Sequence, residues 1–247
     1  MRRAPQLLAA AVSLGAIAVV LTTSGCAVWR IRQAVELAHL SEPFQQRPAN
    51  ATVRLLVVGD STAVGTGADT TTASVAGRLA YQHPKLWVEN RACDGARFAD
   101  VSAQLEGGDE RFDIVLVQAG GNDVMRFSDE SELRQAIDRV TRRAREKAPL
   151  VLLMPSGNVG NAPFFFVPVS GWMTRRSREL HSWIREAAAL HGAVYINLFK
   201  ERDKDRFVRE PGLHARDGLH PSDAGYAVWL QELMAQSSLE AALSSAR

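Results

Sequence analysis

The sequence predicts an α/β domain in which a parallel sheet of five strands lies between two layers of helices. Five short aliphatic runs recur along the chain from residue 53 onward, and longer segments with helical spacing separate them. Such strand–helix alternation is typical of a parallel sheet wrapped by helices on both sides. The runs are continuous rather than alternating, which also indicates strands that are covered on both faces. We therefore expect a three-layer α/β/α sandwich.

The elements follow one another in a regular order. The predicted strands cover residues 53–58, 86–88, 114–117, 150–153 and 193–196. The predicted helices cover residues 71–81, 98–105, 130–147 and 173–191. The third helix places Leu133, Ile137 and Val140 at helical spacing with Arg and Glu elsewhere, which is the pattern of a helix that covers a sheet. Ligands of such sheets bind beyond the C-terminal ends of the strands, so functional residues are expected there.

The chain divides into three regions by composition. Arg2 and Arg3 precede an uncharged, largely apolar stretch, and we interpret residues 1–30 as a signal or a membrane anchor. The stretch is long enough to span a bilayer. Residues 31–50 are a polar connector, and residues 51–240 form one folded domain, because 247 residues with 46% apolar content allow one good core.

The apolar stretch has more than one interpretation. Thr23-Ser24-Gly25-Cys26 faintly resembles a lipoprotein cleavage box, and the same small residues also suit an ordinary cleavage site. A buried helix of a soluble domain is the alternative. Charge on the two flanks is similar, so the positive-inside rule orients the stretch only weakly. We expect a membrane-anchored or secreted protein whose folded domain lies outside the cytoplasm. The sequence does not indicate the oligomeric state.

The amino-acid composition argues against several classes of protein. The formal net charge is +2 and 23% of residues are charged, which argues against a dedicated nucleic-acid binder. The two cysteines, Cys26 and Cys93, provide no disulfide framework. The sequence has neither a CxxC pair nor an HExxH motif, so it predicts no metal site and no cofactor.

Small and polar residues follow each of the first three predicted strands. Ser61 stands at the first strand-to-helix turn, where it can be a nucleophile or simply a helix N-cap. Gly95 follows the second strand and can offer a backbone N–H or form an ordinary turn. Gly120-Gly121-Asn122 follows the third, and its amide can donate into a cleft or belong to a plain loop.

An acid and a base stand close together near the C-terminus. Asp217 precedes His220 by three residues, so on a tight turn its carboxylate can accept a hydrogen bond from the imidazole Nδ1–H. That bond leaves Nε2 free to take a proton from a serine hydroxyl. A solvated loop is the alternative. His214 is a second candidate base, but we favour His220. The other histidines are interpreted as surface or packing residues, and Asp60 and Asp123 as structural.

Taken together in chain order, these motifs resemble the SGNH (GDSL-type) hydrolase family. The match runs from Gly59 to Tyr226, and its most specific part is residues 217–226, DGLHPSDAGY. The resemblance implies the family's flavodoxin-like fold and a serine esterase. It implies Ser61 as nucleophile, His220 as general base and then acid, and Asp217 as its orienting partner.

The resemblance also implies an oxyanion hole and shows some departures. Ser61 N–H, Gly95 N–H and the Asn122 amide would form the hole and lower the barrier to acyl transfer. Thr62 replaces a leucine and Ala92 a frequent glycine of the family's motifs. Asp94 precedes Gly95 directly, so its carboxylate must point away or be paired, with Arg91 or Arg97.

The loop after the fourth strand is rich in aromatic residues. Phe164, Phe165 and Phe166 lie at the expected active edge and could line an acyl pocket for short to medium acyl esters. Alternatively they cover the sheet or touch a membrane. Three function classes follow: an esterase of small-molecule or lipid esters; an acyltransferase, or a deacylase of acylated sugars or lipids, with the same acyl-enzyme; and a non-catalytic binding module. We favour the esterase.

Overall fold

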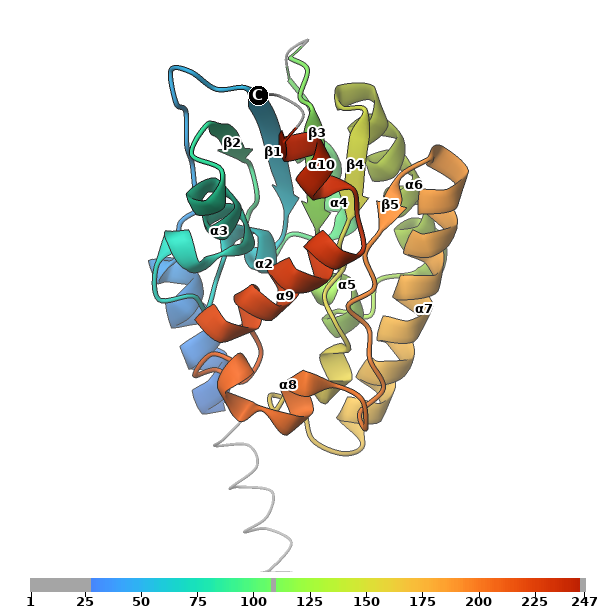
Figure 1. Cartoon of the computed structure of the whole chain (residues 1–247). Coiled ribbons are helices and arrows are strands. Elements are labelled where there is room, and N and C mark those ends of the chain that lie inside the picture. The colour runs from blue at the N-terminus through green and yellow to red at the C-terminus, as the bar shows by residue number, and fades with distance from the viewer. Residues whose placement is uncertain (1–27, 108–109, 245–247) are drawn as a thin grey trace, which may run out of the picture.

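A five-stranded parallel sheet forms the centre of the structure, a computed structural model that describes residues 28–107 and 110–244 (Figure 1). The strands lie in the order β2-β1-β3-β4-β5, and every neighbouring pair is parallel. They are β1 (Val53–Gly59), β2 (Leu86–Asn90), β3 (Ile114–Gln118), β4 (Leu150–Leu153) and β5 (Val194–Tyr195). The predicted three-layer α/β/α fold is confirmed.

The helices fill the connections, with several more short ones than the sequence predicts. The α-helices are α2 (Ser61–Val64), α3 (Val75–Gln82), α4 (Phe98–Gln104), α5 (Gly121–Met125), α6 (Glu130–Lys147), α7 (Val169–His191), α8 (Arg206–Arg209), α9 (Asp223–Ala235) and α10 (Leu239–Ser244). The 3-10 helices are η1 (Thr71–Ala73), η2 (Val159–Asn161) and η3 (Pro211–Leu213). Residues 28–40 are also helical. The predicted helix 71–81 is divided at Ser74, whose side chain caps α3 by accepting from Gly77 N–H.

Each face of the sheet carries its own core. In β1, Leu56 and Val58 face a cluster formed with α4, α6 and α7, whereas Leu55 and Val57 face a cluster formed with α3, α9 and α10. Successive side chains of a strand point to opposite faces, so a continuous aliphatic run serves both clusters at once. Burial of each such side chain contributes about 1.5–3 kcal/mol, which fixes the sheet firmly beneath the loops at its edge.

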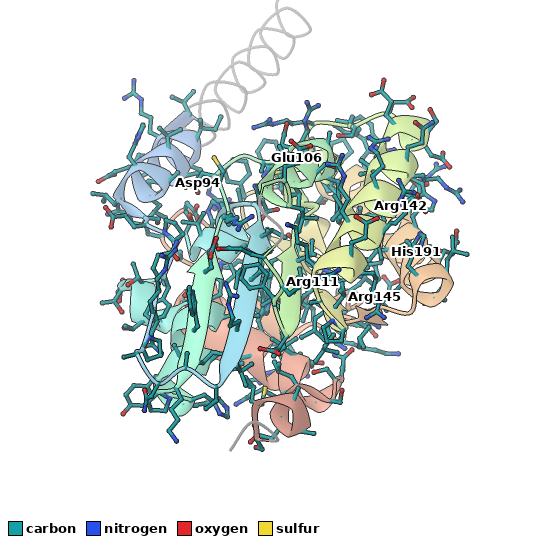
Figure 2. The ribbon with its side chains drawn as sticks, turned by 90° about the horizontal axis from the view of Figure 1, so that it is seen from above. Asp94, Glu106, Arg111, Arg142, Arg145 and His191 are labelled. Atoms are coloured by element: carbon teal, nitrogen blue, oxygen red, sulfur yellow. The ribbon has the colours of Figure 1, made fainter. Side chains whose placement is uncertain are left out.

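Charged side chains lie on the outer surface of the helical layers. In the view of Figure 2, Arg142 and His191 project from α6 and from the end of α7, away from the sheet. Asp138 accepts hydrogen bonds from Arg142 Nη1 at 2.9 Å and from His191 Nε2 at 2.6 Å, and so joins the two helices. His191 is thus a surface contact between helices.

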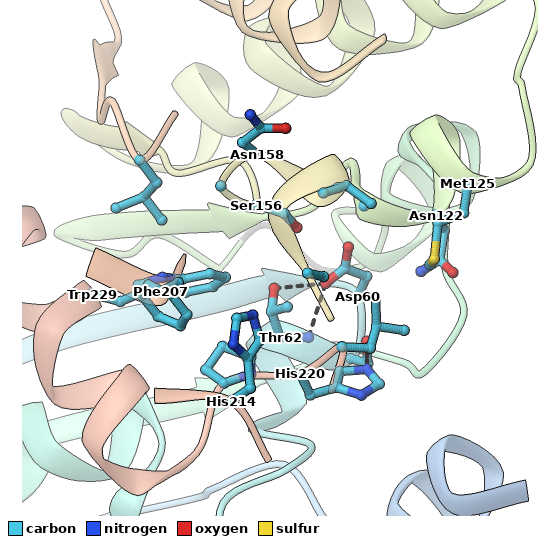
Figure 3. Close-up of a pocket in the computed structure, with 18 of the residues that line it drawn as sticks. Asp60, Thr62, Asn122, Met125, Ser156, Asn158, Phe207, His214, His220 and Trp229 are labelled. Atoms are coloured by element: carbon cyan, nitrogen blue, oxygen red, sulfur yellow. Dashed lines mark hydrogen bonds between the residues drawn. The ribbon is translucent and has the colours of Figure 1, made fainter. Parts of the chain in front are cut away.

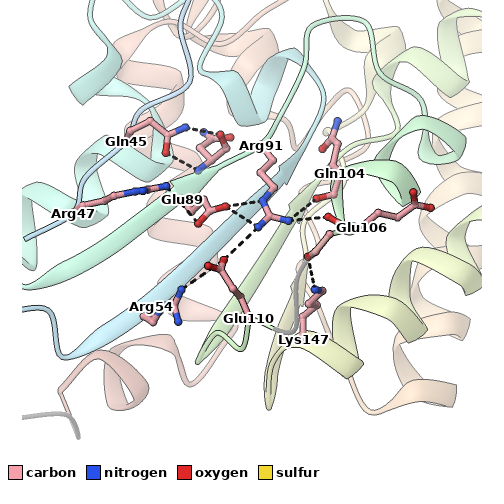
Figure 4. Close-up of polar contacts among 11 residues, drawn as sticks. Gln45, Arg47, Arg54, Glu89, Arg91, Gln104, Glu106, Glu110 and Lys147 are labelled. Atoms are coloured by element: carbon pink, nitrogen blue, oxygen red, sulfur yellow. Dashed lines mark hydrogen bonds and ion pairs between the residues drawn. The ribbon is translucent and has the colours of Figure 1, made fainter.

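Charged side chains from β1, β2 and the segment after β2 form a network of polar contacts (Figure 4). Arg91 Nε donates to Glu89 Oε1 at 2.7 Å, and its Nη1 donates to the carbonyl oxygens of Gln104 and Glu106. Arg54 extends toward Glu110, 3.8 Å away, and its guanidinium stacks over Trp87. These contacts fasten β2 to the segment after α4.

The segment that we interpret as a connector is attached to the sheet. Gln46 and Val88 of β2 exchange two backbone hydrogen bonds of 3.0 and 2.8 Å in an antiparallel bridge, and Phe44 packs on the core. The preceding helix contacts the C-terminal loop through Glu36, 3.1 Å from Arg216. Among the described helices, none is both long and apolar enough to cross a membrane. Most of the N-terminal apolar stretch lies outside the described residues.

Candidate active site

Ser61 begins helix α2, directly after β1 ends. Gly59 makes this turn possible: its φ is +149°, and a Cβ there would lie 1.8 Å from the carbonyl oxygen of Gln118 in β3. The side chain of Gln104 holds the same glycine, accepting from its N–H at 2.7 Å and donating to its oxygen at 2.9 Å. Ser61 is therefore placed by the close approach of Gly59 to the backbone of β3 and by the two hydrogen bonds from the side chain of Gln104 in α4.

Three side chains form a continuous hydrogen-bonded chain. His220 Nε2 lies 2.9 Å from Ser61 Oγ, and His220 Nδ1 lies 2.6 Å from Asp217 Oδ2. Asp217 is fully buried, and its Oδ1 accepts from the backbone N–H groups of Leu219 and His220 at 2.9 and 3.1 Å. Burial opposes ionisation of Asp217, but the hydrogen bonds and charge of His220 and these backbone bonds together lower its pKa. The acid is thus held as a carboxylate.

Asn122 lies in the first turn of α5, after the left-handed Gly120. A Cβ at Gly120 would lie 2.6 Å from Leu180 Cδ2, so only glycine fits at this turn. Asn122 Nδ2 donates to the carbonyl oxygen of Ala96 at 3.1 Å, which joins Asn122 to the loop that contains Gly95. An amide carries two N–H groups, so one remains for a second acceptor. Gly95 itself has φ +76° and lies outside the cavity described below.

Asp94 is paired with a hydroxyl, that of Thr66. Its Oδ1 accepts from Thr66 Oγ1 at 2.7 Å. The expected pairing with Arg91 or Arg97 is not formed, because Arg91 pairs with Glu89 and Arg97 lies 3.8 Å from Asp100. The neutral hydroxyl partner nevertheless fixes the carboxylate in the loop before Gly95.

A cavity of about 80 Å³ adjoins Ser61, His220 and Asn122 (Figure 3). Its apolar wall contains Met125, Val159, Ala162, Leu198, Phe207, Leu219 and Trp229. Phe164, Phe165 and Phe166 are not among the residues that line it. Phe165 packs on the core with α7, and Phe166 is 51% exposed. The backbone of Phe164 donates to the carbonyl oxygen of Gly218, which holds this loop over the outside of the Asp217–His220 turn. The aromatic wall of the cavity comes instead from α8 and α9.

The sequence matches the GDSL-like Lipase/Acylhydrolase family over residues 57–228, which includes the triad and Asn122. The chain belongs to this family. The predicted resemblance is thereby confirmed, and the chain is a serine hydrolase that acts on ester bonds. No curated protein sequence matches the chain.

Solved structures share the fold of this GDSL-like acylhydrolase. The crystal structure of TesA has 22% sequence identity and a TM-score of 0.59, covering 78% of this chain and 99% of that one. Phospholipase A1 from Streptomyces albidoflavus NA297 has 20% identity and a TM-score of 0.59, and the match covers 76% of this chain and 100% of that one. An acetyl xylan esterase from Geobacillus stearothermophilus has 19% identity and a TM-score of 0.53, and the match covers 76% of this chain and 95% of that one.

Two acidic residues of the acylhydrolase motifs bond to nearby backbone. Asp60 Oδ1 accepts from Thr62 N–H at 2.9 Å and from Thr62 Oγ1 at 2.7 Å, which caps α2. Asp123 accepts from Phe98 N–H at 3.0 Å and so joins α5 to the start of α4. Burial raises the pKa of Asp60 to about 6 and also raises the pKa of Asp123.

Sequence reasoning did not connect His181 with the acylhydrolase site. His181 of α7 is buried, with Nε2 2.8 Å from the carbonyl oxygen of Ser156 and Nδ1 2.7 Å from Tyr195 Oη. Burial lowers its pKa to about 4, so the ring is neutral and donates to Ser156. It thereby positions the cavity loop after β4. Its place in the middle of a helical pattern gives no signal of this role.

Proposed function

We propose that Ser61 is the nucleophile of an esterase that works through an acyl-enzyme, with His220 as general base and acid and Asp217 as its orienting carboxylate. The observation that carries this proposal is the unbroken contact from Asp217 Oδ2 through the imidazole to Ser61 Oγ. Imidazole held in this tautomer can accept the serine proton at Nε2.

The proposed reaction has two halves. Ser61 Oγ attacks the ester carbonyl carbon while its proton passes to His220 Nε2. When the tetrahedral intermediate collapses, the C–O bond to the alcohol breaks and His220 returns that proton to the departing oxygen. Water then attacks the acyl-enzyme with His220 as base, which releases the carboxylic acid and restores Ser61. Asp217 stays ionised throughout and stabilises the imidazolium.

The carbonyl oxygen becomes negative in both halves, and we propose Asn122, Ser61 N–H and Gly95 N–H as its donors. Asn122 supports this role because it lines the cavity beside Ser61 and is held by Ala96. Fixed donors of this kind act mainly on the transition state, where each contributes on the order of 3 kcal/mol.

The size of the cavity supports a preference for short acyl groups. Pockets for drug-sized ligands measure roughly 300–1,000 Å³, whereas this cavity measures about 80 Å³. Phe207 and Trp229 line the side of the cavity away from His220 (Figure 3). Hydrolysis should therefore be fastest with acyl groups of two to four carbons.

The test of the proposed function is covalent labelling followed by turnover. A fluorophosphonate should label the full chain once, at Ser61, and Ser61→Ala should abolish labelling and reduce hydrolysis of p-nitrophenyl esters by several orders of magnitude. Retention of near-normal turnover in Ser61→Ala would refute the assignment, and an intact protein that neither labels nor turns over would indicate a binding module.

The same acyl-enzyme also permits two alternative functions: acyl transfer to an acceptor other than water, or deacylation of acylated sugars or lipids. Product analysis in the presence of added alcohols separates the two outcomes. Free acid as the main product supports the hydrolase, and a new ester as the main product supports the acyltransferase.

We further propose that residues 1–30 act as a signal or membrane anchor that places the catalytic domain, residues 51–240, outside the cytoplasm. Arg2 and Arg3 before the apolar stretch support this, as do Val28 and Trp29, which are 51% and 58% exposed at the start of the described helix. Anchoring predicts full-length chain in the membrane fraction and digestion of its domain by protease added outside. Recovery in the cytosol would contradict the proposal.

A further inference from the structure

Two oxygen atoms of residues that line the cavity have no hydrogen-bond partner among the described residues. They are Asp60 Oδ2 and Ser156 Oγ, whose residues are only 1% and 9% exposed. The other carboxylate oxygen of Asp60 is fully engaged by Thr62. An unpaired buried acceptor of this kind is costly, so a hydrogen-bond donor that enters the cavity is stabilised by binding to it.

Both oxygens face the same space. Figure 3 shows the free oxygen of Asp60 and the hydroxyl of Ser156 pointing toward one another across the cavity. Gly121 lies beneath them: a Cβ built there would be 3.0 Å from Ser156 Oγ and 3.8 Å from Asp60 Oδ2. Glycine therefore keeps open the space between the two oxygens.

The charges of the residues that line the cavity indicate which kind of chemical group can bind there. Asp60 and Asp205 line it, and none of its described lining residues is Lys or Arg. Asp205 is already satisfied, because its oxygens accept from Asn161 Nδ2 at 2.7 Å and Phe207 N–H at 2.9 Å. Burial lowers the pKa of His214, so this ring adds no positive charge at neutral pH. The cavity is acidic, and Asp60 Oδ2 is the unpaired carboxylate oxygen in it, beside the unpaired Ser156 Oγ and His214 Nδ1.

We propose that Asp60 and Ser156 form a subsite for a hydrogen-bond donor, a hydroxyl or an ammonium group, at the end of a short acyl chain. The subsite deepens the proposed esterase function and depends on it. An acyl group with a plain alkyl end would fill the same space and leave both oxygens unpaired. Sites built to bond a substrate donor discriminate strongly against the analogue that lacks it. A carboxylate at the chain end would be repelled.

Three methyl esters of equal acyl length test the proposal with the wild-type chain. Methyl butanoate ends in CH₃, methyl 3-hydroxypropanoate in OH and β-alanine methyl ester in NH₃⁺. We expect kcat/KM, measured from acid release in a pH-stat, to be roughly 10- to 100-fold higher for the two donor esters, as a hydrogen bond to a charged acceptor requires. Monomethyl succinate, which ends in a carboxylate, should be the slowest.

Two variants assign the preference to these side chains. Ser156→Ala should lower the ratio of kcat/KM for the donor esters to kcat/KM for methyl butanoate several-fold. In Asp60→Asn, Thr62 keeps the amide oxygen in the Oδ1 position, so the NH₂ group occupies the Oδ2 position and repels an ammonium. That variant should lose its preference for the β-alanine ester. Asp203→Asn, at an exposed carboxylate, is the matched control and should behave as the wild type.

The outcomes separate this inference from the esterase proposal. Equal kcat/KM for all three esters in an active wild type would overturn the subsite and leave the esterase standing. A preference that persists in both Ser156→Ala and Asp60→Asn would also overturn it. No hydrolysis of any ester, together with no fluorophosphonate labelling, would instead mean that the proposed function itself has failed.

Discussion

Asp217 and His220 are three residues apart, yet Oδ2 of one lies 2.6 Å from Nδ1 of the other. Gly218, at φ +68°, allows the turn that brings them together, and the backbone N–H groups of residues 219 and 220 bind the second carboxylate oxygen. The acid thus holds both the backbone of the turn and the imidazole ring. Replacing the Asp217 side chain therefore changes which ring nitrogen of His220 carries the proton.

Asp217→Asn should therefore reduce kcat by on the order of 10⁴. The backbone donors keep the amide oxygen in the Oδ1 position, so the NH₂ group faces Nδ1 and forces the proton onto Nε2. Nε2 can then no longer accept the proton of Ser61. The measurement is hydrolysis of p-nitrophenyl butanoate, with Asp203→Asn as the control for loss of a carboxylate. A loss below tenfold would contradict the assigned role.

Asn122→Ala should reduce kcat by about 10²–10³ with little change in KM, because the proposed role of the amide is to donate to the oxyanion of the transition state. Since Asn122 also bonds Ala96, thermal unfolding must be followed in parallel. Asn122→Asp, which keeps the size but adds negative charge, should be slower still. An alanine variant that retains more than a tenth of the wild-type kcat would exclude Asn122 as a donor.

Phe207→Ala should shift the preferred acyl length upward, because Phe207 lines the cavity and its removal lengthens it. The profile is measured with p-nitrophenyl esters from acetate to decanoate. Phe165→Ala is the matched control, since Phe165 packs on the core outside the cavity, and it should leave the profile unchanged. A shift in the control and none in Phe207→Ala would place the acyl group in the loop of residues 164–166.

Asp60 should make the protein less stable as pH rises. Its pKa is raised from 3.8 to about 6, so between these values the native state holds a proton that the unfolded state has lost. The free energy of unfolding therefore falls through this window, by up to about 3 kcal/mol. Compared with Asp60→Asn by urea unfolding, the wild type should lose this amount from pH 4 to pH 7.5. A constant difference across that range would disprove the assignment.

His181 should make the protein less stable as pH falls, the opposite of the effect of Asp60. Its pKa is lowered from 6.5 to about 4, so between these values the unfolded state binds a proton that the native state does not. The free energy of unfolding therefore falls as pH drops through this window, by up to about 3 kcal/mol. His181→Gln, which keeps a donor for Ser156, should not show this part of the loss. An identical acid profile in both proteins would refute the prediction.

The sequence predicted those parts of the fold that depend on local pattern. Aliphatic runs located all five strands, although β5 is limited to Val194 and Tyr195. Helix α9 was not predicted because its first turn, Asp223-Ala224-Gly225-Tyr226, was interpreted only as part of a family motif. Its start is set by Ser222, whose Oγ accepts from Gly225 N–H. Its inner face then continues through Trp229 and Leu233.

The residues of the site also differ in how well the sequence predicts them. Ser61, Asn122, Asp217 and His220 stand in motifs of fixed order, so their meeting could be predicted. The aromatic loop of residues 164–166 was assigned to the pocket by position alone, and position after a strand does not decide whether a loop folds inward. Ser156 and its free hydroxyl carry no sequence signal, because their environment is made by Asp60 and His181 from distant segments.

The bridge between Gln46 and Val88 also determines where the domain can be cut. It covers the outer edge of β2, and Gln45 exchanges two hydrogen bonds with Asn90, whose side chain in turn bonds the carbonyl oxygen of Ala63 in α2. A protein that begins at residue 47 would expose a bare strand edge to other copies of itself, the usual route to edge-to-edge aggregation. It would also loosen the turn behind Ser61. The minimal soluble enzyme should therefore begin before Phe44.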